Sequence, residues 1–187
     1  GEMITDYSDA AGTMLFNVAE QKWSDEMFEL FNIERSLFPE VDKSAAVIGK
    51  VTKEAAEKTG IPAGTPVING CADQAATSLG AGMVSRGQVT AIIGTAGVVS
   101  VLSDRAAADP ENRVLCWNYC LEDKWINLGI MQTAGESLKW FKNAFDQDSE
   151  DVYQNYNQKA AEIPEGSEGL IFLPYLMGER TPYWDSD

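Results

Sequence analysis

The chain has 187 residues, of which 44% are hydrophobic, 10% aromatic and 23% charged, and its formal net charge is −15. This composition is typical of a packed domain and excludes the hydrophobe-poor, highly charged profile of a disordered chain. Because the excess charge is negative and no cluster of Lys and Arg interrupts it, nucleic acids and anionic membranes are poor partners. The sequence has no run of about 18 apolar residues that would predict a membrane span.

The cysteine and histidine content argues against metal and disulfide sites. There are three cysteines, Cys71, Cys116 and Cys120, and no histidine. An odd number of cysteines in a long chain is not typical of a disulfide framework, and a structural zinc ion needs four ligands. We therefore predict no metal site, thiols in strands or in the core, and a reducing, cytoplasmic environment.

Capping residues and apolar spacing predict mixed helices and strands in the first half of the chain. In chain order, the expected elements are an amphipathic helix capped by Ser24, a helix that Thr52 caps and that runs through Lys58 with Gly60 just past its end, a buried strand at Val67–Asn69, and a helix of small residues from Ala75 to Ala81. Glycines at positions 80, 82 and 87 then predict a domain boundary near residue 80.

The second half begins with two β-branched strands that a glycine-containing turn joins as a hairpin. The expected elements are strands at Val89–Ile93 and Val98–Leu102, further strands at 113–119 and 124–128, a helix at 134–145, an acidic solvated loop at 146–151, a helical stretch to Ala161, and a buried strand at Leu170–Leu176. We expect the helix at 134–145 to begin with free backbone N–H groups. Helices and strands alternate in both halves, so the predicted class is α/β.

Two short motifs carry the chemistry, and each has a plainer interpretation. Asp73 follows the apolar strand at Val67–Asn69, so its carboxylate would emerge at the strand's carboxyl end, where α/β sheets place ligands. The same residue would serve as an N-cap for the helix that follows. The turn Gly94–Gly97 offers unshielded N–H groups and one hydroxyl to phosphate oxygens, but a hairpin needs the same residues for its backbone conformation.

Other nucleotide and hydrolase motifs are absent. The sequence has no Gly-Lys-Ser/Thr phosphate loop, and Gly80-Ala81-Gly82 lacks the third glycine of the dinucleotide fingerprint. Without histidine or a Gly-x-Ser-x-Gly elbow, the usual hydrolase triads are also excluded.

Taken in order, five segments resemble the FGGY family of carbohydrate kinases, and within it xylulose kinases most closely. They are Thr5–Ala10, Gly70–Ala76, Gly94–Val98, Ala134–Trp140 and Phe172–Pro182. The resemblance implies actin-like ATPase (ribonuclease H-like) domains, here incomplete: residues 1–79 as the end of the first, sugar-binding domain and residues 80–187 as the start of the second, nucleotide-binding domain. The chain opens without an initiator methionine and is expected to be a piece that forms no complete active site.

The resemblance also implies a reaction, in which a sugar hydroxyl is phosphorylated by ATP with Mg²⁺. It gives Asp73 the role of catalytic base, and Asp6, Gln74 and Val98 that of substrate-binding residues. The expected nucleotide-binding residues are Gly94, Thr95, Gly97, Gly135 and Lys139. D-xylulose is the expected acceptor, with L-xylulose, gluconate, fuculose and glycerol as alternatives, and the resemblance also allows a homodimer.

Two departures from the family pattern bear on this expectation. Ala72 replaces a glycine just before the proposed base, and Ala96 replaces a serine in the turn. Both changes are small and concern efficiency or sugar choice rather than reaction type. The alternatives outside catalysis are a sugar- or nucleotide-binding member without activity and a structural actin-like module.

Overall fold

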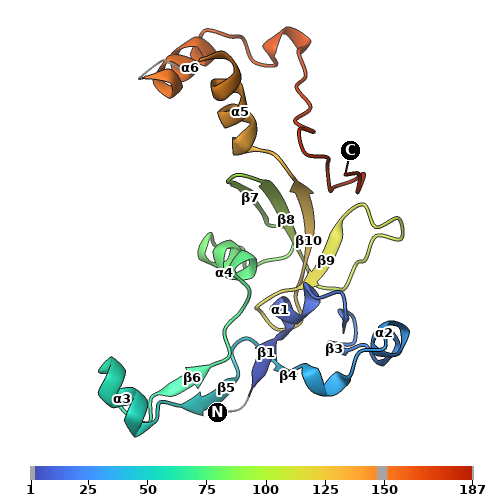
Figure 1. Cartoon of the computed structure of the whole chain (residues 1–187), viewed down its shortest axis with the longest axis vertical. Helices are drawn as coiled ribbons and strands as arrows, with labels where there is room; N and C mark the ends of the chain where they lie inside the picture. The colour runs from blue at the N-terminus through green and yellow to red at the C-terminus, as the bar shows by residue number, and fades with distance from the viewer. Residues whose placement is uncertain (1–2, 147–150, 187) are drawn as a thin grey trace. The chain divides into compact units, whose positions relative to one another are not determined.

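The computed structural model describes residues 3–146 and 151–186 as a mixed α/β fold (Figure 1). The strands are β1 (Ile4–Asp6), β2 (Phe16–Asn17), β3 (Lys22–Trp23), β4 (Glu40–Asp42), β5 (Val47–Lys50), β6 (Pro66–Ile68), β7 (Val89–Ile93), β8 (Gly97–Ser103), β9 (Leu115–Asn118) and β10 (Trp125–Met131). The helices are α1 (Tyr7–Ala11), α2 (Asp25–Phe31), α3 (Lys53–Thr59), α4 (Asp73–Gly80), α5 (Gly135–Phe145) and α6 (Val152–Ala161), with 3₁₀ turns η1 (Arg35–Leu37) and η2 (Ser167–Gly169).

Local capping explains where the first predicted helices begin and end. The Ser24 hydroxyl accepts a hydrogen bond from the Met27 N–H at the start of α2, and the Thr52 hydroxyl accepts one from Ala55 at the start of α3. Gly60 ends α3 with a φ of 77°, which a glycine adopts at no steric cost. The predictions of both helices are confirmed.

The largest sheet has four strands in the order β7-β8-β10-β9, and β10 pairs antiparallel with β9. Gly94–Ala96 join the neighbouring strands β7 and β8, so the predicted hairpin is confirmed. Three two-stranded sheets accompany it: β1 with β4 (parallel), β2 with β3 and β5 with β6 (both antiparallel).

The chain divides into two compact units. The first comprises the described parts of residues 1–90 and 100–128, and the second those of residues 91–99 and 129–187. The border crosses β7, β8 and β10, so it is not a single point along the chain. The predicted domains, 1–79 and 80–187, describe the family architecture and stay a prediction.

An aromatic core in the first unit fixes the position of α1. The ring centroids of Phe16 and Trp23 lie 5.6 Å apart and those of Trp23 and Phe38 lie 5.1 Å apart, both edge to face, and Phe28 and Phe38 form a tilted pair at 5.1 Å. Ala10 and Ala11 of α1 belong to the same buried cluster. Such ring pairs add about 0.5–1.5 kcal/mol beyond the area they bury, and they hold the helix that Asp6 caps.

Two predictions of buried strands are wrong. Val67 and Ile68 of β6 are 39% and 59% exposed, because β6 pairs with β5 in a sheet of only two strands. The segment at 170–176 forms no strand, and its Leu170 is 80% exposed. An apolar run becomes a buried strand only when other strands or helices cover it, and the described residues supply no such cover.

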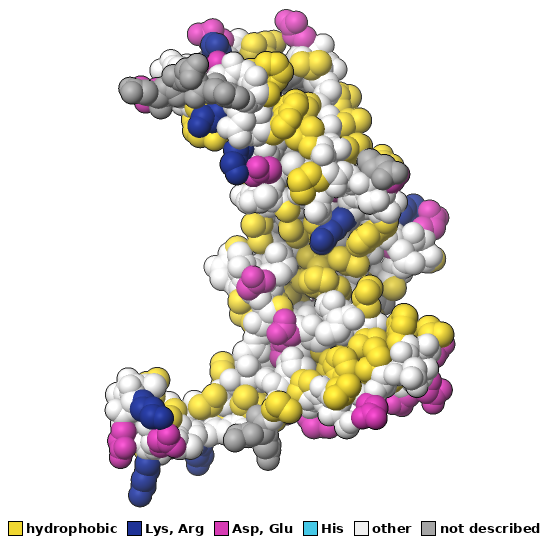
Figure 2. All heavy atoms as spheres, viewed as in Figure 1, with side chains coloured by type: hydrophobic (Ala, Val, Ile, Leu, Met, Phe, Trp, Pro, Cys, Tyr) yellow, Lys and Arg dark blue, Asp and Glu magenta, His cyan; other side chains and the backbone are white. Residues whose placement is uncertain are grey.

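The surface agrees with the composition. On the face drawn in Figure 2, hydrophobic side chains occupy wide areas, whereas Lys and Arg side chains are scattered. Within residues 3–146 and 151–186, the helices are all too short or too polar to cross a bilayer.

Candidate functional site

Asp73 is the first residue of α4 and does not cap it. The N-cap is Ala72, whose side chain offers no hydrogen bond, so the interpretation of Asp73 as a capping residue is wrong. The Asp73 side chain is exposed, and its carboxylate accepts no hydrogen bond from the described part of the chain. A carboxylate that supports no local structure is available to a ligand.

The entry into α4 is held by a hydrogen bond from far along the sequence. The Ala72 N–H donates to the Ser8 hydroxyl at 3.0 Å, across 64 residues of chain. The same hydroxyl donates to Asp6 Oδ2 at 2.7 Å. The loop before Asp73 is therefore tied to α1 through two consecutive hydrogen bonds.

Asp6 is the anchor of this arrangement. It caps α1, is 3% exposed, and accepts hydrogen bonds from four donors. The donors are the Ser8 N–H (3.0 Å), the Ser8 hydroxyl (2.7 Å), the Asp9 N–H (3.0 Å) and the Ser44 hydroxyl (2.6 Å). Four donors offset the cost of burying a carboxylate. The predicted contact of Asp6 with the sugar stays a prediction, and what the structure gives it is a supporting position.

Other contacts hold the body of α4. The Gln74 side-chain amide donates to the Ser100 hydroxyl at 3.1 Å, and Ala75 is 1% exposed. The Cys120 thiol lies 3.8 Å from the Ala75 carbonyl oxygen. Burial raises the pKa of Cys120 to about 11, so this thiol is protonated near neutral pH. Gln74 thus lies one residue from Asp73 on an anchored helix, and its predicted sugar contact remains untested.

The turn after β7 and the start of α5 form a second site. The Gly135 N–H donates to the Gly94 carbonyl at 2.9 Å, and the Ala134 and Glu136 N–H groups donate to the Thr95 carbonyl at 2.8 and 3.3 Å. The prediction of free N–H groups at the start of α5 is therefore wrong, because the carbonyls of the turn occupy them. The two segments predicted to bind nucleotide lie together, about 40 residues apart in sequence.

Glycine is sterically required where these segments meet. A Cβ at Gly135 would lie 2.5 Å from the Gly94 carbonyl oxygen, and one at Gly97 would lie 3.2 Å from the Ala134 Cβ. A contact of 2.5 Å is far below van der Waals distance and would push the turn off the helix. The close approach of two backbones explains Gly135 without appeal to a ligand, whereas the atoms nearest a Cβ at Gly97 belong to the side chains of Ala134 and Met131.

The turn at Gly94–Gly97 still has hydrogen-bond donors that a ligand could use. Within the described ranges, the N–H groups of Thr95 and Ala96 make no hydrogen bond, and neither does the Thr95 hydroxyl. Thr95 is exposed, so these donors can reach an anion such as a phosphate oxygen. The residues present therefore fit a nucleotide phosphate, although the donors come from the turn rather than from α5.

The other predicted residues of this unit lie at its surface. Lys139, one turn into α5, is exposed and pairs with Glu136 at 3.2 Å. Val98 lines an apolar cavity of about 380 Å³ with Gly97 and Ala134 among its neighbours. This lining has few polar groups to meet sugar hydroxyls, and the role of Val98 in sugar binding stays a prediction.

A segment near residue 180 supports the second site. Thr181 and Ile130 exchange two hydrogen bonds, and Glu179 Oε1 accepts one from the Gln132 N–H at 2.7 Å. These bonds fix the end of β10, which three residues separate from the start of α5. Sequence reasoning matched this segment to the family without giving it a role.

Ser8 and Ser44 are the supporting residues that sequence reasoning missed. For Ser8 a signal was present, since Asp6 is a favoured N-cap residue type and Ser8 is the second residue of the helix that it caps. For Ser44 there was none, because it is 38 residues away from its partner Asp6. Long-range side-chain contacts have no local pattern from which to be predicted.

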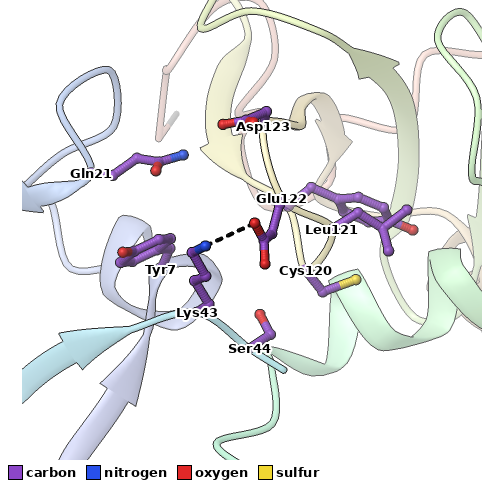
Figure 3. A pocket seen from close by; sticks show the side chains of 9 residues that line it. Tyr7, Gln21, Lys43, Ser44, Cys120, Leu121, Glu122 and Asp123 are labelled. Carbon is purple, nitrogen blue, oxygen red and sulfur yellow. Dashed lines mark hydrogen bonds and ion pairs between the residues drawn. The ribbon is translucent and has the colours of Figure 1, made fainter. Parts of the chain in front are cut away.

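A small polar pocket adjoins the first site (Figure 3). It has a volume of about 120 Å³ and is lined by Tyr7, Gln21, Lys43, Ser44, Tyr119, Cys120, Leu121, Glu122 and Asp123. Lys43 and Glu122 face one another in it at 2.8 Å. This ion pair is more than half exposed on both sides, and pairs of this kind contribute little to stability.

Metal ligands do not gather in the part of the chain that the structure describes. No group of three or more Cys, Asp or Glu side chains is placed to hold an ion there. Cys71, Cys116 and Cys120 are free thiols. The acidic loop at 146–151 lies partly outside the described residues.

Comparisons with known proteins give one consistent result. Residues 1–80 match the sequence model of the N-terminal domain of the FGGY family of carbohydrate kinases. A xylulose kinase of Bacillus subtilis (strain 168) is 35% identical over 186 residues, which cover 100% of this chain and 37% of that protein. A gluconokinase of the same organism is 30% identical over 196 residues, covering 100% and 38%.

Solved structures agree with these matches. The ligand-bound xylulose kinase from Lactobacillus acidophilus superimposes with a TM-score of 0.88 at 28% identity, covering 100% of this chain and 37% of that one. The chain thus spans little more than a third of the length of the relatives that it matches.

Proposed function

Because this chain belongs to the FGGY family of carbohydrate kinases, we propose that the whole protein transfers the γ-phosphoryl group of ATP to a sugar hydroxyl. The observation that carries the proposal is the meeting of Gly94, Thr95 and Gly135 in one exposed, small-residue site with unused N–H donors. Turns of this kind bind phosphate oxygens in many nucleotide-binding proteins.

Asp73 is the proposed general base. Its exposed carboxylate would accept the proton of the sugar hydroxyl while that oxygen forms its bond to phosphorus. A neutral hydroxyl is a weak nucleophile, and a positioned base typically contributes about 10²- to 10⁴-fold, or about 3–5 kcal/mol of the barrier. Within residues 3–146 and 151–186, the Asp73 side chain neither caps α4 nor accepts a hydrogen bond, which supports this role.

The proposed nucleotide site comprises Gly94, Thr95, Gly97, Gly135 and Lys139. The Thr95 and Ala96 N–H groups would hold phosphate oxygens, and the Lys139 ammonium would lie on the same side of α5 as its partner Glu136. Mg-ATP supplies the phosphoryl group, and Mg²⁺ is proposed to enter with it.

We propose D-xylulose as the acceptor and D-xylulose 5-phosphate as the product, with gluconate as the second candidate. Support for the first is the set of relatives named xylulose kinase at about a third identity, and for the second the gluconokinase at 30%. Asp6, Gln74 and Val98 are proposed on the sugar side, Asp6 through its support of the loop that leads to Asp73.

Several broader properties are proposed with the activity. The fold is proposed to be actin-like, and the TM-score of 0.88 to a solved xylulose kinase supports it. A domain border near residue 80 is supported by the family match to residues 1–80. A cytoplasmic location and a homodimer complete the proposal.

The test incubates the whole protein with Mg-ATP and each member of a panel of pentuloses, polyols and aldonates, and measures the rate of ADP release. We expect turnover with D-xylulose, loss of turnover in Asp73→Asn, and nearly unchanged nucleotide binding in that variant. Turnover with gluconate alone would select the second acceptor. Asp73→Asn with wild-type turnover would remove Asp73 from the role of base, and sugar binding without ADP release would indicate a non-catalytic member.

A further inference from the structure

We propose that Ser8 is a positioning residue that sets the direction of the Asp73 carboxylate through the backbone of Ala72. The inference rests on the proposed role of Asp73 as base. Ser8 lies 2% exposed in α1, so it is not placed to touch a substrate. Its effect on catalysis would pass through the loop that begins α4.

The first step is the fixed direction of the Ser8 hydroxyl. Asp6 Oδ2 only accepts hydrogen bonds, so the Ser8 hydroxyl must donate its proton to it, at 2.7 Å. The Ser8 oxygen is then left to accept, and the Ala72 N–H donates to it at 3.0 Å. The order of donation, from Ala72 to Ser8 to Asp6, is therefore determined by chemistry alone.

The second step is the strength of this chain of hydrogen bonds. A hydroxyl that donates to a buried carboxylate is polarised and becomes a better acceptor. Asp6 is held in turn by the Ser44 hydroxyl and two N–H groups of α1, so it has little freedom to follow a moving partner. Ser8 thus presents a rigid acceptor to the Ala72 N–H.

The third step is the short distance from Ala72 to the proposed base. Ala72 is the N-cap of α4 and Asp73 is the next residue, so one peptide unit joins the held N–H to the carboxylate's own backbone. Gly70, two residues earlier, has a φ of 89° and marks a turn rather than a regular element. Without the Ser8 contact, this loop would lose a fixed point beside Asp73.

The body of α4 does not depend on Ser8. The Ala76 N–H donates to the Ala72 carbonyl at 2.9 Å, the Gln74 amide contacts Ser100, and Ala75 is buried. Loss of the Ser8 hydroxyl should therefore leave the helix formed and shift only its first residues. A general base misplaced by a fraction of an ångström to 1 Å costs up to about 10²-fold in rate.

The test compares three variants of the whole protein with the wild type and with Asp73→Asn. Ser8→Ala removes the hydroxyl that holds Ala72, and Ser8→Thr keeps it. Ser44→Ala is the matched control, since it also removes a serine hydroxyl from Asp6 Oδ2. The hydrogen bond that the Ser44 carbonyl accepts from the Gly70 N–H, in the loop before α4, is made by backbone atoms and is kept in this variant. We expect Ser8→Ala to lower kcat about 10- to 100-fold with both KM values within about twofold, and Ser8→Thr and Ser44→Ala to stay within about threefold of wild type.

A second measurement does not require turnover. Hydrogen exchange of the Ala72 amide should be at least about tenfold faster in Ser8→Ala and unchanged in Ser44→Ala. Equal exchange in Ser8→Ala and wild type would overturn the inference, as would equal losses of kcat in Ser8→Ala and Ser44→Ala. If Asp73→Asn keeps wild-type turnover, the proposed role of Asp73 as base is wrong. That outcome is independent of the Ser8 variants, so the two failures can be told apart.

Discussion

Ala72, directly before Asp73, and the turn at Gly94–Gly97 are supported in opposite ways. The Asp6 carboxylate and the Ser8 hydroxyl carry the hydrogen bonds that reach Ala72, whereas the Gly70 N–H, earlier in the same loop, donates to the Ser44 carbonyl. The turn is held by backbone, because the carbonyls of Gly94 and Thr95 accept hydrogen bonds from the N–H groups of Ala134, Gly135 and Glu136. A side-chain support fails when atoms are removed, whereas a backbone support fails when atoms are added.

The largest effect is expected where the side-chain support has its anchor. Asp6→Ala leaves two N–H groups and two hydroxyls without their common acceptor, and it removes the cap of α1. An unsatisfied buried donor costs about 1–3 kcal/mol and a lost cap about 1 kcal/mol. We expect the free energy of unfolding to fall by about 2–4 kcal/mol, measured by urea denaturation of the whole protein.

Asp9→Ala is the control for that experiment. It removes a carboxylate from the same helix, but the Asp9 side chain is exposed and accepts no hydrogen bond from the residues that the structure describes. We expect a change within about 0.5 kcal/mol, as for most surface substitutions. Equal losses in the two variants would show that charge near α1, rather than the buried hydrogen bonds, stabilises the loop.

The backbone support should break when a single carbon is added. In Gly135→Ala the new Cβ would lie 2.5 Å from the Gly94 carbonyl oxygen, so the turn must leave the start of α5. Overpacking of this kind costs about 1–3 kcal/mol, and we expect nucleotide affinity to fall about tenfold or more. Isothermal titration with ADP, together with thermal unfolding, measures both effects.

Gly129→Ala provides the matched control in the same unit. Its Cβ would meet Thr181 Cγ2 at 3.7 Å and the Val99 carbonyl at 4.0 Å, which are ordinary contacts. We expect stability and ADP affinity close to those of the wild type. If Gly129→Ala loses as much stability and ADP affinity as Gly135→Ala, the effect of Gly135→Ala cannot be assigned to the clash with the Gly94 carbonyl.

The same contrast explains which features could be predicted from sequence. Caps such as Ser24 and Thr52 act within one helical turn, and both helices were predicted correctly. The hairpin at Gly94–Gly97 was also predicted, because its signal lies in adjacent residues. The Ser8–Ala72 contact and the union of the turn with Gly135 join residues far apart in sequence, and local patterns hold no information about them.

Burial was the least predictable property. The apolar run at Val67–Asn69 suggested a covered strand, and the run at Leu170–Leu176 suggested another, yet both are largely exposed. The hydrophobicity of a segment indicates that its burial would be favourable, but it does not indicate which strand or helix would cover it. The roles of Asp73 and Thr95 likewise came from resemblance to a family, since each motif alone had a plainer interpretation.

The rate at which Cys71 is alkylated reports on the charge of Asp6 and is expected to change less than stability does in Asp6→Ala. Burial raises the pKa of Cys71, and the negative charge of Asp6 raises it further. A raised thiol pKa lowers the thiolate fraction at pH 8, so Asp6→Asn, which removes the charge at nearly constant volume, should speed alkylation of Cys71. Cys116 is the internal reference, because burial raises its pKa without a contribution from Asp6. Iodoacetamide labelling followed by mass spectrometry measures both rates, and equal acceleration would indicate general loosening.

The smallest effect is expected at Ala72, where this chain departs from the family's glycine. Ala72 has φ −54° and ψ 144°, which any L-residue adopts without strain, so its methyl group costs nothing in the folded state. Ala72→Gly keeps the N–H that donates to Ser8 and adds freedom only to the unfolded chain, so stability should fall by about 0.4–1 kcal/mol. Urea denaturation and kcat are measured together. A gain in kcat would mean that the methyl group crowds the acceptor sugar, whereas an unchanged kcat would confirm that the loop depends on the held N–H and not on the side chain that carries it.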